Sequence, residues 1–105
     1  MMAMSEKRKP TYDLKAIKTA FATAAGLKAT GSAIQDAAAL GFGSAEIIDT
    51  VQSIQRTHFH KSMTSYADHQ VWQDVYYVPS EVGTLHVKFT ADAVTEFLLL
   101  SFKEK

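Results

Sequence analysis

The amino-acid composition of the chain changes near Arg56, and this change limits the folds that the chain can adopt. Alanine and other apolar residues recur at helical spacing before Arg56, whereas aromatic and β-branched residues are enriched after it. Helices followed by strands predict an α+β fold in which N-terminal helices pack on an antiparallel sheet. A chain of 105 residues can form one domain with one core. We expect residues 1–10 to be a flexible lead-in and residues 11–105 to be a single domain.

Three helices are predicted in the first half. One begins at Asp13 and stops near Gly26, a second spans Thr30 to Leu40, and a third begins at Ser44. Apolar residues at helical spacing share one side of each helix: Leu14, Ile17 and Phe21 in the first, Ile34, Ala37 and Ala38 in the second, and Ile47, Val51 and Ile54 in the third.

Four strands are predicted in the second half, near residues 58–64, 70–77, 84–90 and 97–103. Residues 79–83 and 90–95 are expected to be turns. Because side chains alternate along a strand, His86 and Lys88 should share one face of the third strand. In the last strand we expect Leu98, Leu100 and Phe102 on one face, with Ser101 and Lys103 on the other.

Composition excludes several classes of protein. The chain has no cysteine, which rules out disulfides and thiolate metal sites. No apolar run approaches the roughly 20 residues of a membrane span, and residues 1–4 do not resemble a secretion signal. The net charge is zero, although residues 1–28 carry a basic surplus. Nucleic-acid binding would therefore depend on local patches and be sensitive to salt.

Polar side chains are unusually rich within the predicted strands. Lysines, histidines, a glutamine and tyrosines occur there, for example at His60, Lys61, Gln73, His86 and Lys103. Such groups can remove a proton, return one and stabilise a negative oxygen without a metal. These are the groups that a ribonuclease needs.

The same segments resemble a known family. The strings HKSMTSYADHQVWQDVY, LHVKFT and SFKEK are similar to the MqsR family of bacterial toxins. Weaker similarity covers Glu6-Lys7-Arg8 with Pro10, Ser32-Ala33 and Leu40-Gly41. The resemblance implies a RelE-like fold and a ribosome-independent endoribonuclease that cuts mRNA at short GC-containing sites. It also implies a cytoplasmic bacterial protein, inhibited by an MqsA-like antitoxin that contains zinc and binds operator DNA through a helix-turn-helix.

The resemblance also implies catalytic positions. Lys61, Gln73 and Lys103 match positions of the family's active site, where lysines can stabilise charge on the scissile phosphate. His86 stands where the family has a tyrosine, and a histidine there can serve as general acid or base. We expect these four residues to be catalytic, with no cofactor and no metal, through attack of the substrate's own 2′-hydroxyl.

Other residues are expected to support the site or the fold. His60, Tyr66, His69 and Lys88 are possible supporting residues, and Tyr66 and Asp68 can instead satisfy buried backbone groups. Bases could stack on Trp72, Tyr76 or Tyr77, although core packing is favoured for Trp72. An exposed position in a strand is favoured for His58.

Three alternatives remain open from the sequence. His58 and His60 could project from one strand face and begin a zinc site, with His69 or His86 completing it. The chain could also be a catalytically inactive module that binds RNA or the antitoxin. Finally, the polar face could be a protein–protein interface only.

Overall fold

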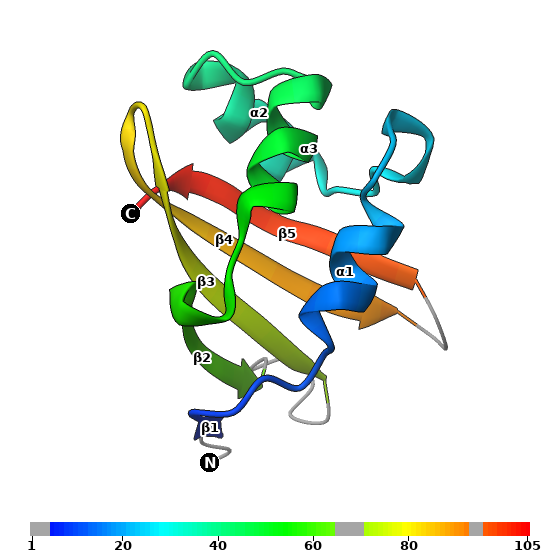
Figure 1. The fold of residues 1–105 in the computed structure, drawn as a ribbon, viewed down its shortest axis with the longest axis vertical. Coiled ribbons are helices and arrows are strands. Elements are labelled where there is room, and N and C mark those ends of the chain that lie inside the picture. The colour runs from blue at the N-terminus through cyan, green and yellow to red at the C-terminus, as the bar shows by residue number, and fades with distance from the viewer. Residues whose placement is uncertain (1–4, 65–70, 93–95) are drawn as a thin grey trace.

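The computed structural model describes residues 5–64, 71–92 and 96–105. Within these ranges the helices cover one face of a five-stranded antiparallel sheet (Figure 1), which confirms the predicted α+β fold. Each strand pairs with its neighbour in sequence. No helix in the described part of the chain is long and apolar enough to cross a membrane. The elements are β1 (Glu6–Lys7), α1 (Leu14–Ala20), η1 (Ala24–Gly26), α2 (Gly31–Ala39), α3 (Ser44–Ser53), η2 (Arg56–His58), β2 (Phe59–Thr64), β3 (Trp72–Ser80), β4 (Gly83–Asp92) and β5 (Glu96–Glu104).

The first helix begins as predicted but ends early. The Asp13 carboxylate accepts a hydrogen bond from the Lys15 backbone N–H, which caps α1. The helix ends at Ala20 rather than near Gly26. Gly26 instead closes the short turn η1, where a Cβ atom would overlap the carbonyl oxygen of Ala20. The glycine therefore allows the chain to fold back on the end of α1.

Of the three apolar residues predicted to share one side of the second helix, only Ala37 is buried. Ala33 and Ala37 are buried, whereas Ile34 and Ala38 are exposed. The cause is the close approach of this segment to β5, where the backbone N–H of Thr30 donates to the carbonyl of Leu99. Side chains of methyl size let a helix pack closely on a strand, so the alanines take the inward positions.

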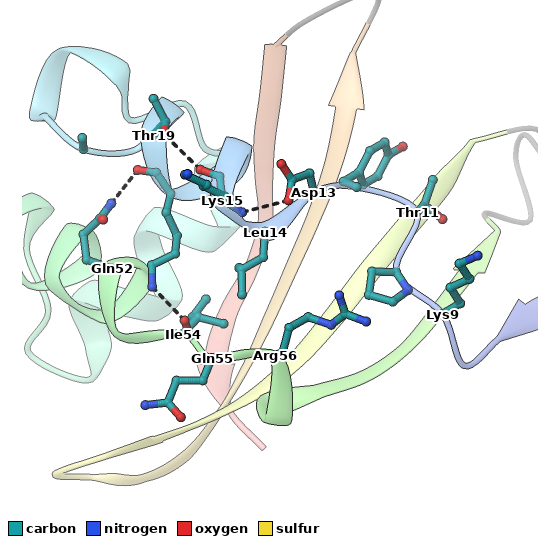
Figure 2. A pocket seen from close by; sticks show the side chains of 14 residues that line it. Lys9, Thr11, Asp13, Leu14, Lys15, Thr19, Gln52, Ile54, Gln55 and Arg56 are labelled. Carbon is teal, nitrogen blue, oxygen red and sulfur yellow. Dashed lines mark hydrogen bonds between the residues drawn. The ribbon is translucent and has the colours of Figure 1, made fainter.

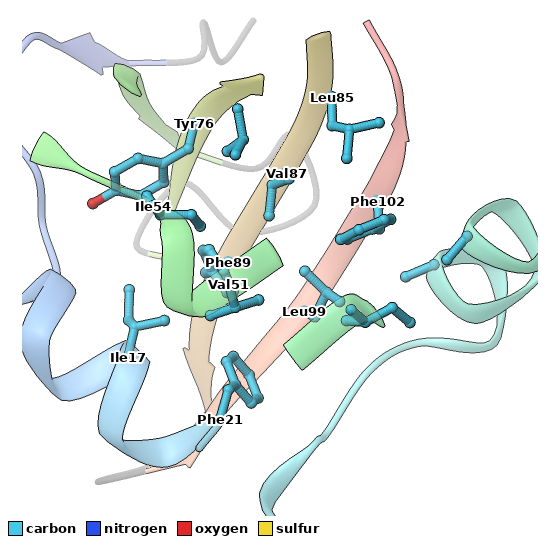
Figure 3. Packing of buried hydrophobic residues seen from close by; sticks show 14 residues of the cluster. Ile17, Phe21, Val51, Ile54, Tyr76, Leu85, Val87, Phe89, Leu99 and Phe102 are labelled. Carbon is cyan, nitrogen blue, oxygen red and sulfur yellow. The ribbon is translucent and has the colours of Figure 1, made fainter. Parts of the chain in front are cut away.

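The third helix and the core match the prediction. Glu46 accepts a hydrogen bond from the Gly43 backbone N–H at the start of α3, and this helix buries Ile47 and Val51. The core lies between the helices and one face of the sheet (Figure 3). It contains Ile17, Phe21, Ala33, Ala37, Ile47, Val51, Ile54, Tyr76, Val78, Leu85, Val87, Phe89, Leu99 and Phe102.

The predicted strands are present, with different ends. Pro79 and Ser80 belong to β3 rather than to a loop, and Ala91 and Asp92 belong to β4 rather than to a turn. Proline has no backbone N–H to donate to a neighbouring strand. This costs nothing at Pro79, because β2 pairs with β3 only as far as Tyr76 and no strand in the described part of the chain lies on that side of Pro79. The short strand β1, which pairs Glu6 with Met63 on β2, was not among the predicted strands.

An irregularity in the β4–β5 pairing overturns one predicted face. Lys88 pairs with Ser101 but Phe89 pairs with Leu99, so Leu100 is an extra residue on β5. The extra residue lets both Leu99 and Phe102 reach the core. Leu98 and Leu100, which were predicted to share one face with Phe102, are only half-buried, whereas Phe102 is fully buried.

A buried carboxylate joins the sheet to the segment before α1. Asp74 on β3 is fully buried and accepts hydrogen bonds from the backbone N–H groups of Thr11 and Tyr12, at 3.1 and 2.9 Å. The Thr11 hydroxyl also contacts the Ser62 hydroxyl on β2, at 2.7 Å. These contacts fix the path of residues 9–13 along the edge of the sheet.

Candidate active site

The sheet has a second face, turned away from the helices, which we call the polar face. Tyr76 and Val87 point to the core, so the alternating residues Tyr77 and His86 must point to the polar face. The strand register then assigns more side chains to this face: Lys61, Gln73 and Val75, with Lys88, Ser101 and Lys103. The predicted catalytic residues Lys61, Gln73, His86 and Lys103 therefore share one face.

His86 and Lys103 are direct neighbours on this face. They are paired residues of β4 and β5, whose side chains start about 5 Å apart. Lys88 lies diagonally across from Lys103, because it pairs with Ser101. An imidazole and two ammonium groups thus lie within reach of a single phosphate group.

The surroundings of His86 favour its neutral form. Its Nδ1 lies 2.9 Å from the Ser101 hydroxyl, which fixes the ring and leaves Nε2 for a substrate. Burial lowers the pKa of His86, and the charges of Lys88 and Lys103 lower it further. A neutral imidazole near pH 7 can accept a proton, as a general base must.

Lys88 and Lys103 differ in exposure. Lys88 is half-buried, and burial followed by the nearby charge of Lys103 lowers its pKa. Lys103 is exposed at the edge strand. Both cations lie beside His86, where they can stabilise negative charge on a phosphorus-bound oxygen.

Lys61 lies on the same face but is ion-paired and separate from His86. It pairs with Val75, and its Nζ lies 2.5 Å from an Oε1 of Glu6 on β1. The hydrogen bond and charge of Lys61 lower the pKa of Glu6. Lys61 pairs with Val75 and Val75 pairs with Lys88, so His86 lies two strands away from Lys61 and two residues farther along. Their backbones are therefore about 12 Å apart.

A row of rings fills the space between those two positions. The His60 ring stacks on Tyr77 with centroids 4.2 Å apart, and Tyr77 lies 6.0 Å from His86. Lys105 places its Nζ 4.5 Å from the centre of the Tyr77 ring. Burial lowers the pKa of His60, as do the charges of Lys61, Arg8 and Lys105. The row offers flat surfaces and two imidazoles that favour their neutral form.

A bulge explains why His60 is in this row. Phe59 pairs with Tyr76 and Lys61 pairs with Val75, so His60 is an extra residue in β2. The bulge brings His60 and Lys61 to the same face, although they are consecutive in sequence. Simple alternation would have placed them on opposite faces.

Gln73 lies farther along the sheet. It pairs with Met63 on β2, and four residues of β3, about 13 Å, separate it from Tyr77. It is half-buried. Gln73 therefore lies too far along the sheet to act on the same chemical group as His86.

The structure differs from the roles predicted for Tyr76 and Trp72. Tyr76 is fully buried in the core and cannot stack on a base. Trp72 is not part of the core cluster; it is half-buried, with the Lys7 Nζ 4.2 Å from its ring centre. Tyr66, Asp68 and His69 lie outside the described residues.

The structure also lacks the pairing of His58 with His60 on which the zinc alternative depended. His58 belongs to η2 rather than to a strand, and its Nδ1 accepts a hydrogen bond from the Gln55 backbone N–H. His60 instead stacks on Tyr77. The two rings therefore do not project from one strand face, as the zinc alternative required.

The sequence did not predict that three further residues contribute to the site. Ser101 orients His86, Glu6 pairs with Lys61, and Lys105 covers Tyr77. Alternation in the last strand had placed Ser101 beside Lys103, which was a usable signal. The contacts of Glu6 and Lys105 depend on strand register, which the sequence does not reveal.

Comparison with known proteins agrees with the resemblance found from the motifs. The family model described as "Motility quorum-sensing regulator, toxin of MqsA" matches residues 9–104. The chain is also 35% identical over 100 residues to a protein of Escherichia coli (strain K12) named "mRNA interferase toxin MqsR". That alignment covers 95% of this chain and 99% of the relative. The chain therefore belongs to the MqsR toxin family.

Proposed function

We propose that this protein is an endoribonuclease toxin that cuts mRNA without a metal and without the ribosome. The observation that carries the proposal is the pairing of His86 with Lys103, beside Lys88, on the polar face. The family relationship supports it, since the Escherichia coli relative is named an mRNA interferase. We also propose that its cut sites are short and contain G and C, as the resemblance of the motifs to the family implies.

In the proposed reaction the RNA supplies the nucleophile. His86 removes the proton of a 2′-hydroxyl group through Nε2, and the 2′-oxygen forms a bond to the adjacent phosphorus. Lys103 and Lys88 stabilise the negative oxygens of the phosphorane-like transition state. The bond from phosphorus to the 5′-oxygen breaks, which gives a 2′,3′-cyclic phosphate and a 5′-hydroxyl end.

The leaving oxygen needs a proton from the side opposite His86. His60 and Lys61 lie on β2, across Tyr77 from His86. The ammonium group of Lys61 can donate this proton, as can His60 in its less favoured protonated form. Gln73 lies where it can contact an adjacent nucleotide through its amide. DNA has no 2′-hydroxyl and should not be cut.

The partner and setting follow from the family. We propose that a co-encoded MqsA-like antitoxin with zinc and a helix-turn-helix binds this protein and holds it inactive, and that operator DNA is contacted only through this complex. The matched family is described as the toxin of MqsA, which supports such a partner. The free toxin would arrest growth in the bacterial cytoplasm.

The competing proposal is an inactive module that binds RNA or the antitoxin. It is favoured by the zero net charge and by the ion pair that occupies Lys61. Purified protein with labelled RNA and EDTA separates the two. We expect cleavage, lost in His86→Ala and Lys103→Ala but kept in Lys28→Ala, which removes an exposed cation held by Glu96. Intact RNA with antitoxin binding retained would establish the module, and loss of cleavage on adding EDTA would refute the metal-free reaction.

A further inference from the structure

A groove of about 840 Å³ lies on the helix side of the molecule, away from the polar face (Figure 2). Its walls are α1, the end of α3 with η2, and residues 9–13 before α1. The volume is within the range of ligand sites in proteins. The groove is therefore large enough to hold part of a ligand chain.

The charges along the groove are mostly positive. Four cationic side chains line it, Lys9, Lys15, Lys18 and Arg56, against the single lining carboxylate of Asp13. Asp13 is engaged as the cap of α1, and Lys18 donates to the carbonyl of Ile54, at 2.9 Å. Lys9, Lys15 and Arg56 are exposed and have no ion-pair partner among the described residues. This arrangement favours an anionic ligand.

A buried hydroxyl near the groove lacks a partner. The Tyr76 hydroxyl is buried and has no hydrogen bond within the described part of the chain. It points out of the core toward the side of α1 (Figure 3). Burial raises its pKa to about 12, the charge of Asp74 raises it further, and smaller effects come from Arg56 and Asp13, both groove residues. Tyr76 does not itself line the groove, so its hydroxyl is not a direct contact for a ligand there.

The positive charges continue from the groove to the polar face. Arg8 is close enough to His60 and Glu6 to lower the pKa of both, while the next residue, Lys9, lines the groove. These residues follow β1, which borders β2 at the edge of the sheet. Cationic side chains therefore run around this edge from one face of the molecule to the other.

We propose that the groove binds the phosphate backbone of single-stranded RNA beside the cleaved linkage. This inference rests on the proposed nuclease function and adds a second contact region for its substrate. Lysines contact phosphates as point charges, and an arginine can donate two parallel hydrogen bonds to one phosphate. Continuity with the polar face favours RNA over an acidic segment of a protein partner, which would have no reason to follow the charges to His60.

The test compares RNAs of two lengths, about 4 and about 16 nucleotides, which span the site sizes of single-strand binding folds. Both carry one cleavage site with a 2′-deoxy nucleotide there, so that binding is measured without cutting. The variant is Lys9→Gln/Lys15→Gln/Arg56→Gln, which spares the structural hydrogen bond of Lys18. The control is Lys28→Gln, an exposed cation outside the groove. Thermal unfolding of each variant establishes that the fold is retained.

We expect the triple variant to bind the long RNA at least about tenfold more weakly and the short RNA almost unchanged. The dependence of log affinity on log salt should fall by about 2 for the long RNA, as expected for three lost phosphate contacts with a single strand. Lys28→Gln should show neither effect. Equal losses on both RNAs, or losses no larger than those of Lys28→Gln, would overturn the groove proposal.

Two further outcomes separate this inference from the proposed function. If the long RNA binds through the groove but ordinary RNA is never cut, the proposal of a nuclease is refuted and the proposal of an RNA-binding groove stands. If the triple variant cuts RNA of both lengths equally well, the proposal of an RNA-binding groove is refuted and the proposal of a nuclease stands. Unchanged RNA binding with weakened antitoxin binding would assign the groove to an acidic protein segment and would also overturn the inference.

Discussion

His86 on β4 lies directly opposite Lys103 on β5, on the face of the sheet that points away from the helices. The pairing follows from the regular part of the β4–β5 register, which extends from Leu85 to Lys88 on β4. It places a group that can take a proton beside one that can hold negative charge. The proposed RNA cleavage depends on this pair.

The pH dependence of cleavage should report the pKa of His86. Burial, Lys88 and Lys103 hold that pKa below its ordinary value of 6.5, and the base works only when neutral. Activity should therefore rise with pH through a pKa below 6.5. In Lys88→Gln one lowering charge is gone, so the acid limb of kcat/KM should move to higher pH. An acid limb that stays in place, or moves to lower pH, would show that His86 is not the base.

The stability of the fold should also depend on pH through His60 and His86. Both have a pKa below 6.5 in the folded chain, so the unfolded chain binds protons first as pH falls. The free energy of unfolding should decrease as pH drops below 6.5 and through the two folded pKa values. Urea unfolding at about pH 7.5 and about pH 5.5 measures this decrease. The double variant His60→Gln/His86→Gln should show a smaller decrease; an identical one would refute the assignment.

Removing Glu6 should make Lys61 available to RNA. The ion pair of Glu6 with Lys61 is partly exposed, and such pairs contribute little to the free energy of unfolding because solvent screens their charges. Glu6→Gln should therefore raise kcat/KM for RNA by up to about fivefold, with little change in the free energy of unfolding. Glu96→Gln, which breaks the pair with Lys28 elsewhere on the surface, is the matched control. A fall in kcat/KM would mean that Glu6 positions Lys61 rather than competes for it.

Asp74 should be among the most important polar residues for stability. Its buried carboxylate accepts two backbone hydrogen bonds, from Thr11 and Tyr12, and bonds to charged groups contribute about 1.5–3 kcal/mol each. Asp74→Ala should lower the free energy of unfolding by about 3 kcal/mol or more. The exposed Asp49→Ala should change it by less than about 0.5 kcal/mol. Chemical denaturation of both variants checks this, and a small effect of Asp74→Ala would contradict the anchoring role.

The sequence predicts the elements of this fold better than their faces. Helical spacing identified Ile17 and Val51 as core residues, because no irregularity interrupts α1 or α3 at those positions. The faces of β2 and β5 could not be predicted in full, because the bulges at His60 and Leu100 each add a residue to a strand. A bulge is set by pairing with a distant strand, which periodicity within one strand does not contain.

In the candidate site, likewise, the residues could be predicted better than their contacts. Family motifs identified Lys61 and Lys103, and strand alternation placed His86 with Lys88. Neither source could show that Lys61 is ion-paired with Glu6, since that contact joins residues 55 positions apart. The buried position of Asp74 was also not predicted, because nothing in WQDVY distinguishes it from a solvated strand residue.

The most direct test of the central claim is the chemical identity of the RNA ends that the purified protein leaves in the presence of EDTA. We predict a 2′,3′-cyclic phosphate and a 5′-hydroxyl. Cleavage should be abolished by a single 2′-deoxy nucleotide at the cut site, and it should be lost in His86→Ala. A 5′-phosphate end, or unchanged cutting at the 2′-deoxy position, would contradict this claim.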